Sequence, residues 1–207
     1  MKVDTQCELV LASGSPRRAE LLRLLGVEFS VRHADIDETP RPGEPPGELT
    51  LRLALEKALA VGRSAGQAAV LGGDTSVAID DHILGKPADR RAAEEMLGRL
   101  SGRSHRVYTA VAIVKGADRR SLLSTSHVNF AELSAREIEE YCATGEPLDK
   151  AGAYGIQGRA GAFVRRVDGS CSGIVGLPLW ETRRLLLETG IIVEAGKEVF
   201  QPRINVD

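Results

Sequence analysis

The N-terminal part of the chain contains a short apolar run that leads through a tight turn directly into a helical pattern. Residues 8–12 read Glu-Leu-Val-Leu-Ala, which is typical of a strand buried on both faces. The turn at residues 13–16, Ser-Gly-Ser-Pro, follows at once, and leucines then recur at helical spacing until Gly26, a residue suited to the position just past a helix end. Because such a helix packs back on the sheet that the strand enters, this unit predicts an α/β fold.

Strands and helices continue to alternate along the rest of the chain. We expect further strands at residues 27–33, 68–71, 76–79 and 162–167, and a long hairpin that joins 105–115 to 122–130. Helical patterns are found at residues 49–64, 89–100, 134–145 and 178–189. The chain of 207 residues can bury a substantial core, so we predict a mixed central sheet flanked by helices, in a single domain over residues 1–207.

The turn at residues 13–18, Ser-Gly-Ser-Pro-Arg-Arg, is a candidate phosphate site. Ser15 suits the N-cap and Pro16 the first helical position, so Arg17 and Arg18 fall in the first turn of the helix. Two arginines are unfavourable at the positive end of a helix dipole unless an anion is bound there. A phosphate chain would resolve this conflict through the exposed backbone N–H groups, the serine hydroxyls and the guanidinium groups. The alternative is an ordinary helix start with two solvated arginines.

A carboxylate at a glycine-rich position forms the second candidate. The apolar run 68–71 is followed by Gly-Gly-Asp-Thr at residues 72–75, and we expect the glycines to interrupt the strand and expose Asp74. A carboxylate at the end of a buried strand can hold Mg²⁺ against phosphates or accept a proton from an attacking water. The alternative is a turn aspartate that bonds its own backbone.

Scattered charged side chains could complete such a site. Lys57, Lys86 and Lys150 lie in apolar or tightly turned surroundings, and phosphoryl transfer needs cations to balance the charge on the phosphate oxygens. Glu38 lies in an acidic run before a proline-rich loop at residues 39–47, which could act as a lid, and it could supply a second metal ligand. Most such side chains in proteins are simply solvated. No histidine is assigned a catalytic role.

Composition and motifs exclude several other classes of function. With 27 basic and 29 acidic residues, the formal net charge is −2, so we expect no nucleic acid or anionic membrane as a partner. Three widely separated cysteines argue against a disulfide framework and a zinc site, and no signal sequence or membrane span is recognisable, so we expect a cytoplasmic protein. The chain has neither a Gly-x-Ser-x-Gly elbow nor a dinucleotide-binding glycine fingerprint after its first strand.

Taken together, the motifs resemble those of the Maf family of nucleoside triphosphate pyrophosphatases, in the same order and over nearly the whole chain. The matching stretches are 11–18 (Leu-Ala-Ser-Gly-Ser-Pro-Arg-Arg), 73–75 (Gly-Asp-Thr), 85–87 (Gly-Lys-Pro), 102–107 (Gly-Arg-Ser-His-Arg-Val), 145–158 and 175–179 (Val-Gly-Leu-Pro-Leu). The segment 145–158, Gly-Glu-Pro-Leu-Asp-Lys-Ala-Gly-Ala-Tyr-Gly-Ile-Gln-Gly, would be hard to produce by chance even alone.

The resemblance implies an activity, a fold and a set of site residues. It implies cleavage between the α and β phosphates, a divalent metal such as Mg²⁺ or Mn²⁺, a homodimer, and a two-lobed fold like that of inosine triphosphatases with the nucleotide in the cleft. Asp74 matches the position of the proton acceptor. By motif position, the phosphate and metal site would comprise Ser13, Arg17, Arg18, Glu38, Lys57 and Lys86, with Glu38 and Asp74 as metal ligands. The positions linked to base choice are Arg17, Thr75 and Gln157.

Two features look like the family branch that acts on dTTP and UTP, with CTP or modified pyrimidine nucleotides as further candidate substrates. Residues 15–18 contain no insertion, and residues 154–158 read Tyr-Gly-Ile-Gln-Gly, whereas the branch that acts on 7-methyl-GTP differs at both places. The Gln157 amide offers both a donor and an acceptor, which suits the N3–H and a carbonyl of uracil or thymine. Gly73, Ser76 and the stretch 171–173 depart from the usual family pattern. The alternatives are a 7-methyl-GTP pyrophosphatase, a non-catalytic nucleotide-binding regulator of cell division, and a phosphomonoesterase.

Overall fold

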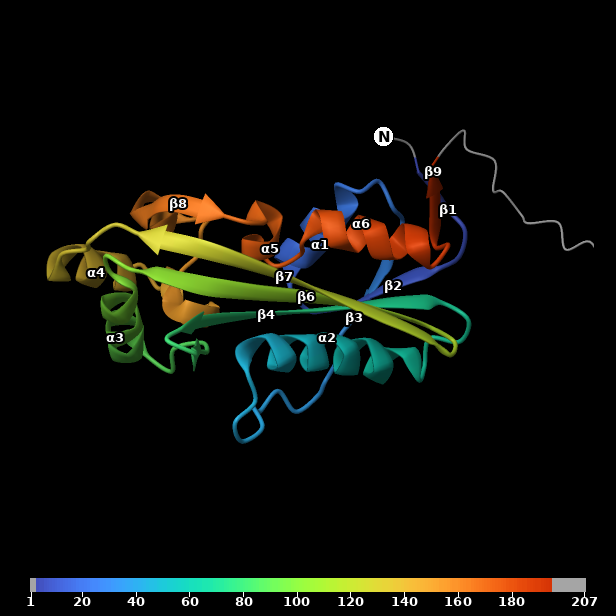
Figure 1. Cartoon of the computed structure of the whole chain (residues 1–207), viewed down its shortest axis with the longest axis horizontal. Coiled ribbons are helices and arrows are strands. Elements are labelled where there is room, and N and C mark those ends of the chain that lie inside the picture. Colours follow the sequence, from blue (N-terminus) through green and yellow to red (C-terminus); the bar gives the residue numbers. More distant parts are fainter. Residues whose placement is uncertain (1–2, 195–207) are drawn as a thin grey trace, which may run out of the picture.

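The computed structural model describes residues 3–194, which form a mixed β-sheet covered by helices on both faces (Figure 1). The sheet has seven strands in the order β3-β2-β4-β6-β7-β8, with β5 paired to β4. Their bounds are β2 Leu9–Ala12, β3 Ser30–Arg32, β4 Ala69–Ile79, β5 His82–Leu84, β6 Ser104–Lys115, β7 Asp118–Phe130 and β8 Val164–Asp168. A separate pair of strands, β1 (Val3–Thr5) and β9 (Ile192–Glu194), joins the two ends of the described chain.

The first half of the sheet is parallel and the second half antiparallel. β2 pairs in parallel with both β3 and β4, and the connections run through helix α1 (Pro16–Arg23) and helix α2 (Pro46–Gly62). From β4 onward the strands β6, β7 and β8 pair antiparallel, and the β6–β7 hairpin turns at Gly116 and Ala117. The sequence-based prediction of a mixed central sheet flanked by helices is confirmed.

Alternating side chains of the short strand β2 supply two different cores. Leu9 and Leu11 pack with α1 and with α6 (Leu179–Glu188) on one face, and Val10 packs against α2 on the other. In Figure 1, α1 and α6 lie above the sheet and α2 lies below it. The continuous apolar run at the start of the chain is therefore explained by a strand that has a helix layer on each side.

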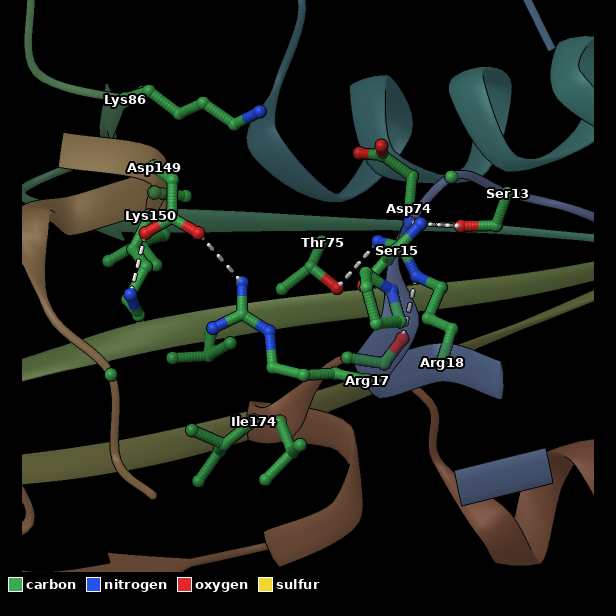
Figure 2. A pocket seen from close by; sticks show the side chains of 18 of the residues that line it. Ser13, Ser15, Arg17, Arg18, Asp74, Thr75, Lys86, Asp149, Lys150 and Ile174 are labelled. Atoms are coloured by element: carbon green, nitrogen blue, oxygen red, sulfur yellow. Dashed lines mark hydrogen bonds and ion pairs between the residues drawn. The ribbon is translucent and has the colours of Figure 1, made fainter. Parts of the chain in front are cut away.

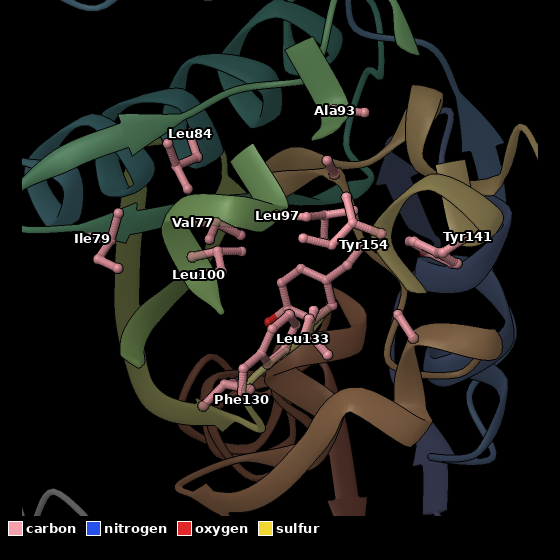
Figure 3. Close-up of a cluster of buried hydrophobic side chains, with 14 of the residues drawn as sticks. Val77, Ile79, Leu84, Ala93, Leu97, Leu100, Phe130, Leu133, Tyr141 and Tyr154 are labelled. Carbon is pink, nitrogen blue, oxygen red and sulfur yellow. The ribbon is translucent and has the colours of Figure 1, made fainter. Parts of the chain in front are cut away.

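A third core lies at the other end of the long strands (Figure 3). It is enclosed by α3 (Arg90–Leu100), α4 (Ala135–Cys142), and three short 3-10 helices, η1 (Glu146–Asp149), η2 (Ala151–Ala153) and η3 (Arg159–Phe163). Phe130, Tyr154 and His105 meet there edge to face, with ring centroids 4.9 to 5.3 Å apart. The strands β4, β6 and β7 run through both ends, so a single sheet joins two lobes.

Several predicted elements are confirmed, among them the long hairpin, the helices at residues 89–100 and 178–189, and the Ser134/Glu137 capping box. Others differ. The strand predicted at residues 27–33 is reduced to the three exposed residues of β3 at the sheet edge, and α2 begins at Pro46 within the segment predicted as a loop. A short helix, α5 (Cys171–Val175), was not predicted. No helix within residues 3–194 has the length and apolar character needed to cross a membrane.

The strand β4 corrects the prediction that residues 72–75 interrupt it. β4 runs without a break from Ala69 to Ile79, through both glycines and Asp74. Gly72 is required for packing rather than for a bend, because a Cβ at this position would lie 2.1 Å from the carbonyl oxygen of Ala54 and 2.9 Å from the backbone nitrogen of Ala58. The missing side chain lets α2 approach the sheet closely.

Candidate active site

A cavity of about 690 Å³ lies where β4 is paired on only one side. β2 pairs with β4 as far as Gly72, and β5 pairs with it only from Val77 onward. In the described sheet, residues 73–76 thus have β6 as their only neighbour, and this gap in the sheet opens the cavity. Its lining combines the turn 12–18 with residues 33–38 and 74–77, the segments 146–158 and 174–176, and the lysines at 57 and 86.

The two faces of β4 place adjacent residues into different parts of this site. Asp74 points to the α2 side, where its Oδ1 accepts a hydrogen bond from Lys57 Nζ at 2.7 Å. Thr75, on the opposite face, contacts Arg18 from the start of α1. Because successive residues of a strand alternate between faces, a continuous β4 is what separates these two functional groups.

Lys57 lies between two carboxylates. Its Nζ is 2.7 Å from Asp74 Oδ1 and 2.7 Å from Glu38 Oε1, and the Lys57 and Asp74 side chains are each only 9% exposed. Glu38 is 58% exposed and reaches the cluster from the loop after β3. Within residues 3–194, Asp74 Oδ2 makes no hydrogen bond or ion pair, so this oxygen can accept one from a ligand.

Arg18 is partly buried and bridges three segments of the chain (Figure 2). Its Nη1 donates to Ser13 Oγ at 3.2 Å, its Nη2 to Thr75 Oγ1 at 3.2 Å, and its Nε to the carbonyl oxygen of Gly176 at 2.9 Å. Burial lowers the pKa of Arg18 from its ordinary value, and the nearby carboxylates of Asp74 and Glu38 oppose that shift. An arginine remains charged in proteins, so Arg18 supplies a fixed positive charge beside the turn.

The turn before α1 is organised by Ser13. Ser15 occupies the predicted N-cap position, but its side chain makes no capping hydrogen bond. Ser13 Oγ instead accepts a hydrogen bond from the Ser15 backbone N–H at 3.2 Å and another from Arg18. The first N–H groups of α1 have no side-chain cap, which is the arrangement that binds anions at helix N-termini.

The opposite wall of the cavity comes from the segment around η1. Arg17 extends across to Asp149, with Arg17 Nη2 3.9 Å from Asp149 Oδ2, and Lys150 Nζ donates to Asp149 Oδ1 at 2.6 Å (Figure 2). The hydrogen bond from Lys150 lowers the pKa of Asp149 below its usual range. Lys86 reaches the cavity from the segment after β5. Cationic side chains therefore face the cavity from both lobes.

Comparison with known protein sequences identifies the family of this chain. A family model described as "Maf-like protein" matches residues 8–189, which is most of the chain. The chain belongs to the Maf family. The protein of Hahella chejuensis, 55% identical over 186 residues that span 88% of this chain and 92% of the relative, is named dTTP/UTP pyrophosphatase. The proteins of Symbiobacterium thermophilum (50% over 189 residues, 91% and 97%) and Myxococcus xanthus (51% over 186 residues, 90% and 94%) carry the same name.

All nine site residues predicted from the sequence line the cavity of this Maf protein. They are Ser13, Arg17, Arg18, Glu38, Lys57, Asp74, Thr75, Lys86 and Gln157. Their individual roles remain predictions. Within residues 3–194 no group of three or more His, Cys, Asp or Glu side chains could hold a metal ion, so Glu38 and Asp74 do not form a complete metal cage in this Maf chain.

Some lining residues had no assigned role in the sequence. His33 follows β3, which is parallel to β2, so it emerges beside Ser13 at the same sheet edge. Its ring lies against the turn, where a Cβ on Gly14 would be 1.9 Å from His33 Nε2. In the sequence, Glu146 and Asp149 were identified only as members of the motif at residues 145–158. The parallel pairing of β2 and β3 could have indicated His33, but a single exposed histidine gives no such signal by itself.

The rear of the site is fixed by a buried polar pair. His105 Nε2 lies 2.8 Å from the Tyr154 hydroxyl, and Tyr154 lines the cavity. Burial lowers the pKa of His105 to about 4 and raises that of Tyr154 above its ordinary value. Both side chains are therefore neutral near pH 7, which fits a structural rather than an acid–base role for His105.

Proposed function

We propose that this protein hydrolyses dTTP and UTP between the α and β phosphates, releasing the nucleoside monophosphate and pyrophosphate. The observation that carries the proposal is the meeting of Asp74 and Lys57 with the uncapped turn 13–18 and with Gln157 in one cavity. The names of relatives about half identical to this chain over most of its length support the same activity.

Basic side chains that line the cavity would bind the triphosphate. The N–H groups at the start of α1, the Ser13 hydroxyl and the Arg17 guanidinium would bind phosphate oxygens on one side, and Lys86 would bind them from the other. On binding the triphosphate, the Arg17 guanidinium would leave its long, exposed contact with Asp149 and contact a phosphate instead. Because charge spreads over the phosphate oxygens during transfer, cations placed on several sides stabilise the transition state.

A divalent cation, Mg²⁺ or Mn²⁺, would complete the site. Glu38 and Asp74 are close enough to share Lys57 Nζ, and two carboxylates with room for phosphate oxygens suit Mg²⁺, which is commonly held by one or two carboxylates and the substrate phosphates. The donor set thus fits a cation that binds together with the triphosphate. Such a cation neutralises phosphate charge and polarises the phosphoryl group.

Asp74 would bind the attacking water and accept a proton from it. Lys57 holds Asp74 Oδ1 at 2.7 Å, which fixes the carboxylate and leaves Oδ2 directed to ligand. A water hydrogen-bonded to Oδ2 would attack a phosphorus atom next to the α–β bridging oxygen while a proton of the water passes to the carboxylate. The bond from that phosphorus to the bridging oxygen would break, which releases the nucleoside monophosphate and pyrophosphate. One oxygen of the carboxylate is thus held by Lys57, and the other is available to accept that proton.

The segment 155–158 would recognise the base. Gln157 lines the cavity, and its amide can pair with the N3–H and a carbonyl of uracil or thymine. Thr75 and Arg17 lie at the same site and would limit the space and polarity around the base and sugar.

The test is to incubate the purified protein with Mg²⁺ and separately with dTTP, UTP, CTP, ATP and 7-methyl-GTP, and to identify the products by chromatography. We expect dTMP and UMP with pyrophosphate, and no turnover after chelation of the metal with EDTA. Orthophosphate as the first product would indicate a phosphomonoesterase, and a preference for 7-methyl-GTP would indicate the other branch of the family. Binding without turnover of any nucleotide would indicate a non-catalytic regulator.

A further inference from the structure

The loop that carries Gln157 is held on both sides by two residues that are not assigned to the reaction. The Gly155 backbone N–H donates to the Tyr141 hydroxyl at 3.3 Å, and the Arg159 backbone N–H donates to Glu146 Oε2 at 3.2 Å. The Tyr141 hydroxyl in turn donates to Glu146 Oε1 at 3.0 Å. One hydrogen-bonded pair, from α4 and η1, thus holds the loop two residues before and two residues after Gln157.

The glycines of this loop allow the carboxylate to lie against its backbone. A Cβ at Gly158 would be 2.0 Å from Glu146 Oε1, so a larger residue there would displace Glu146. A Cβ at Gly155 would lie 2.7 Å from Lys150 Cε, and Lys150 Nζ donates to the backbone carbonyl oxygen of Glu146 at 2.6 Å. The motif glycines at 155 and 158 therefore make room for the side chains that support the loop.

Tyr141 is itself rigidly placed. It is 3% exposed, and its ring packs edge to face on Phe163 with centroids 5.3 Å apart. Burial raises the pKa of Tyr141 above its ordinary value, so the hydroxyl keeps its proton and remains a donor to Glu146. The support for the loop is consequently anchored in the core of one lobe.

Gln157 depends on this support because its own side chain has none. Within the described part of the chain, the Gln157 amide makes no hydrogen bond, and the residue is exposed at the cavity wall. The backbone on either side therefore determines where this side chain enters the cavity. A displacement of about 1 Å is enough to lose a directional contact to a base.

We propose that Tyr141 and Glu146 act as positioning residues that orient Gln157 and thereby set the preference for uracil and thymine. This inference rests on the proposed function, because it assigns the base-binding wall of that same site. Neither residue contacts the phosphate-binding turn, so the two walls should respond separately to mutation.

The experiment compares Tyr141→Phe, Glu146→Ala and Glu146→Gln with two matched controls. Tyr108→Phe also removes the hydroxyl of a largely buried tyrosine but lies on β6 outside the cavity lining, and Glu139→Gln changes an exposed glutamate on α4. For each protein we would measure KM and kcat with UTP and CTP, the inhibition constant of inorganic tripolyphosphate, which has no base, and amide hydrogen exchange at residues 155 and 159.

We expect Glu146→Ala to raise KM for UTP about 10-fold and to lower the ratio of UTP to CTP kcat/KM, as the loss of a charged hydrogen bond predicts. Tripolyphosphate inhibition should change less than about twofold, since the phosphate-binding turn is untouched. Glu146→Gln keeps an acceptor for the Arg159 N–H and should recover part of the loss. Exchange should speed up at Gly155 in Tyr141→Phe and at Arg159 in Glu146→Ala.

Two results would overturn the inference. Equal increases in the UTP KM and the tripolyphosphate inhibition constant would mean that the whole cavity is disturbed, and unchanged selectivity would mean that the pair does not position Gln157. If the unmutated protein cleaves no nucleotide, the proposed function fails instead. The inference is then decided by the affinity for uridine 5′-(α,β-imido)triphosphate and by the exchange rates, and unaltered exchange at both amides would refute it.

Discussion

Lys57 Nζ on α2 lies 2.7 Å from Asp74 Oδ1 on β4, and the two residues are 7% and 6% exposed. Removing such a pair from water is costly, and it is tolerated when the charges are well paired. Glu38 provides a second carboxylate at 2.7 Å from the same ammonium group. The ion pair therefore fixes the Asp74 carboxylate near the position where α2 closely approaches the sheet.

Replacing Asp74 by asparagine tests its role as proton acceptor. Asp74→Asn preserves shape but removes the base, so we expect kcat for UTP to fall by at least about 100-fold, the lower end of general base contributions. Lys57 keeps Glu38 as a partner, and the fold should persist. Steady-state kinetics and circular dichroism measure the two effects. Unreduced kcat in the folded variant would exclude Asp74 from the mechanism.

Removing the ammonium group of Lys57 should destabilise the protein. Lys57→Met leaves the Asp74 charge buried without its partner, and we expect the free energy of unfolding to fall by about 3 kcal/mol. Asp74→Asn added to this variant should restore part of the loss, because the uncompensated charge is gone. Urea unfolding of the two single variants and the double variant gives the coupling free energy between Lys57 and Asp74. Lys115→Met, at the end of β6 and outside the cavity lining, is the control, and strictly additive effects would contradict the prediction.

The contact between α2 and the sheet can be tested at Gly72. Gly72→Ala places a methyl group 2.1 Å from the Ala54 carbonyl oxygen, so we expect a loss of about 3 kcal/mol in unfolding free energy, at the upper end for overpacking. Gly98→Ala is the matched change on α3, where nothing lies within 4 Å of the new Cβ. It should stabilise by about 0.5–1 kcal/mol through helix propensity. A Gly72→Ala protein as stable as the parent would show that α2 does not pack tightly against β4 at this position.

The buried His105 predicts a pH-dependent stability. Its pKa is lowered by burial to about 4 from an ordinary 6.5, so the unfolded chain takes up a proton between these values and the folded protein does not. Stability should be complete above about pH 6.5 and fall by up to about 3 kcal/mol on acidification to pH 4. Unfolding measured from pH 7.5 to 4 should show a smaller slope in His105→Gln. The exposed His127→Gln should retain the original slope, and an equal slope in all three proteins would refute the assignment.

Much of the fold was accessible from the sequence because local patterns specify it. The apolar run before Ser13, the capping box at Ser134 and the hairpin around Gly116 each depend on residues close together in the chain. The motif residues of the site were also identifiable, and all nine line one cavity. The errors arose where tertiary contacts overrode local preference. Gly72 looked like a strand breaker, yet it permits a continuous strand because its missing side chain admits α2.

The sequence by itself determined the α/β alternation, the family and the residue types that a triphosphate site needs. Only the tertiary structure decided that β4 continues through Asp74, so that Asp74 faces Lys57 and Thr75 faces Arg18 on opposite sides of the sheet. It also decided where the cavity opens, between the end of β2 and the start of β5 along β4. The physical reason is that strand pairing and helix–sheet contact join residues far apart in the chain, and no local pattern records which partners meet.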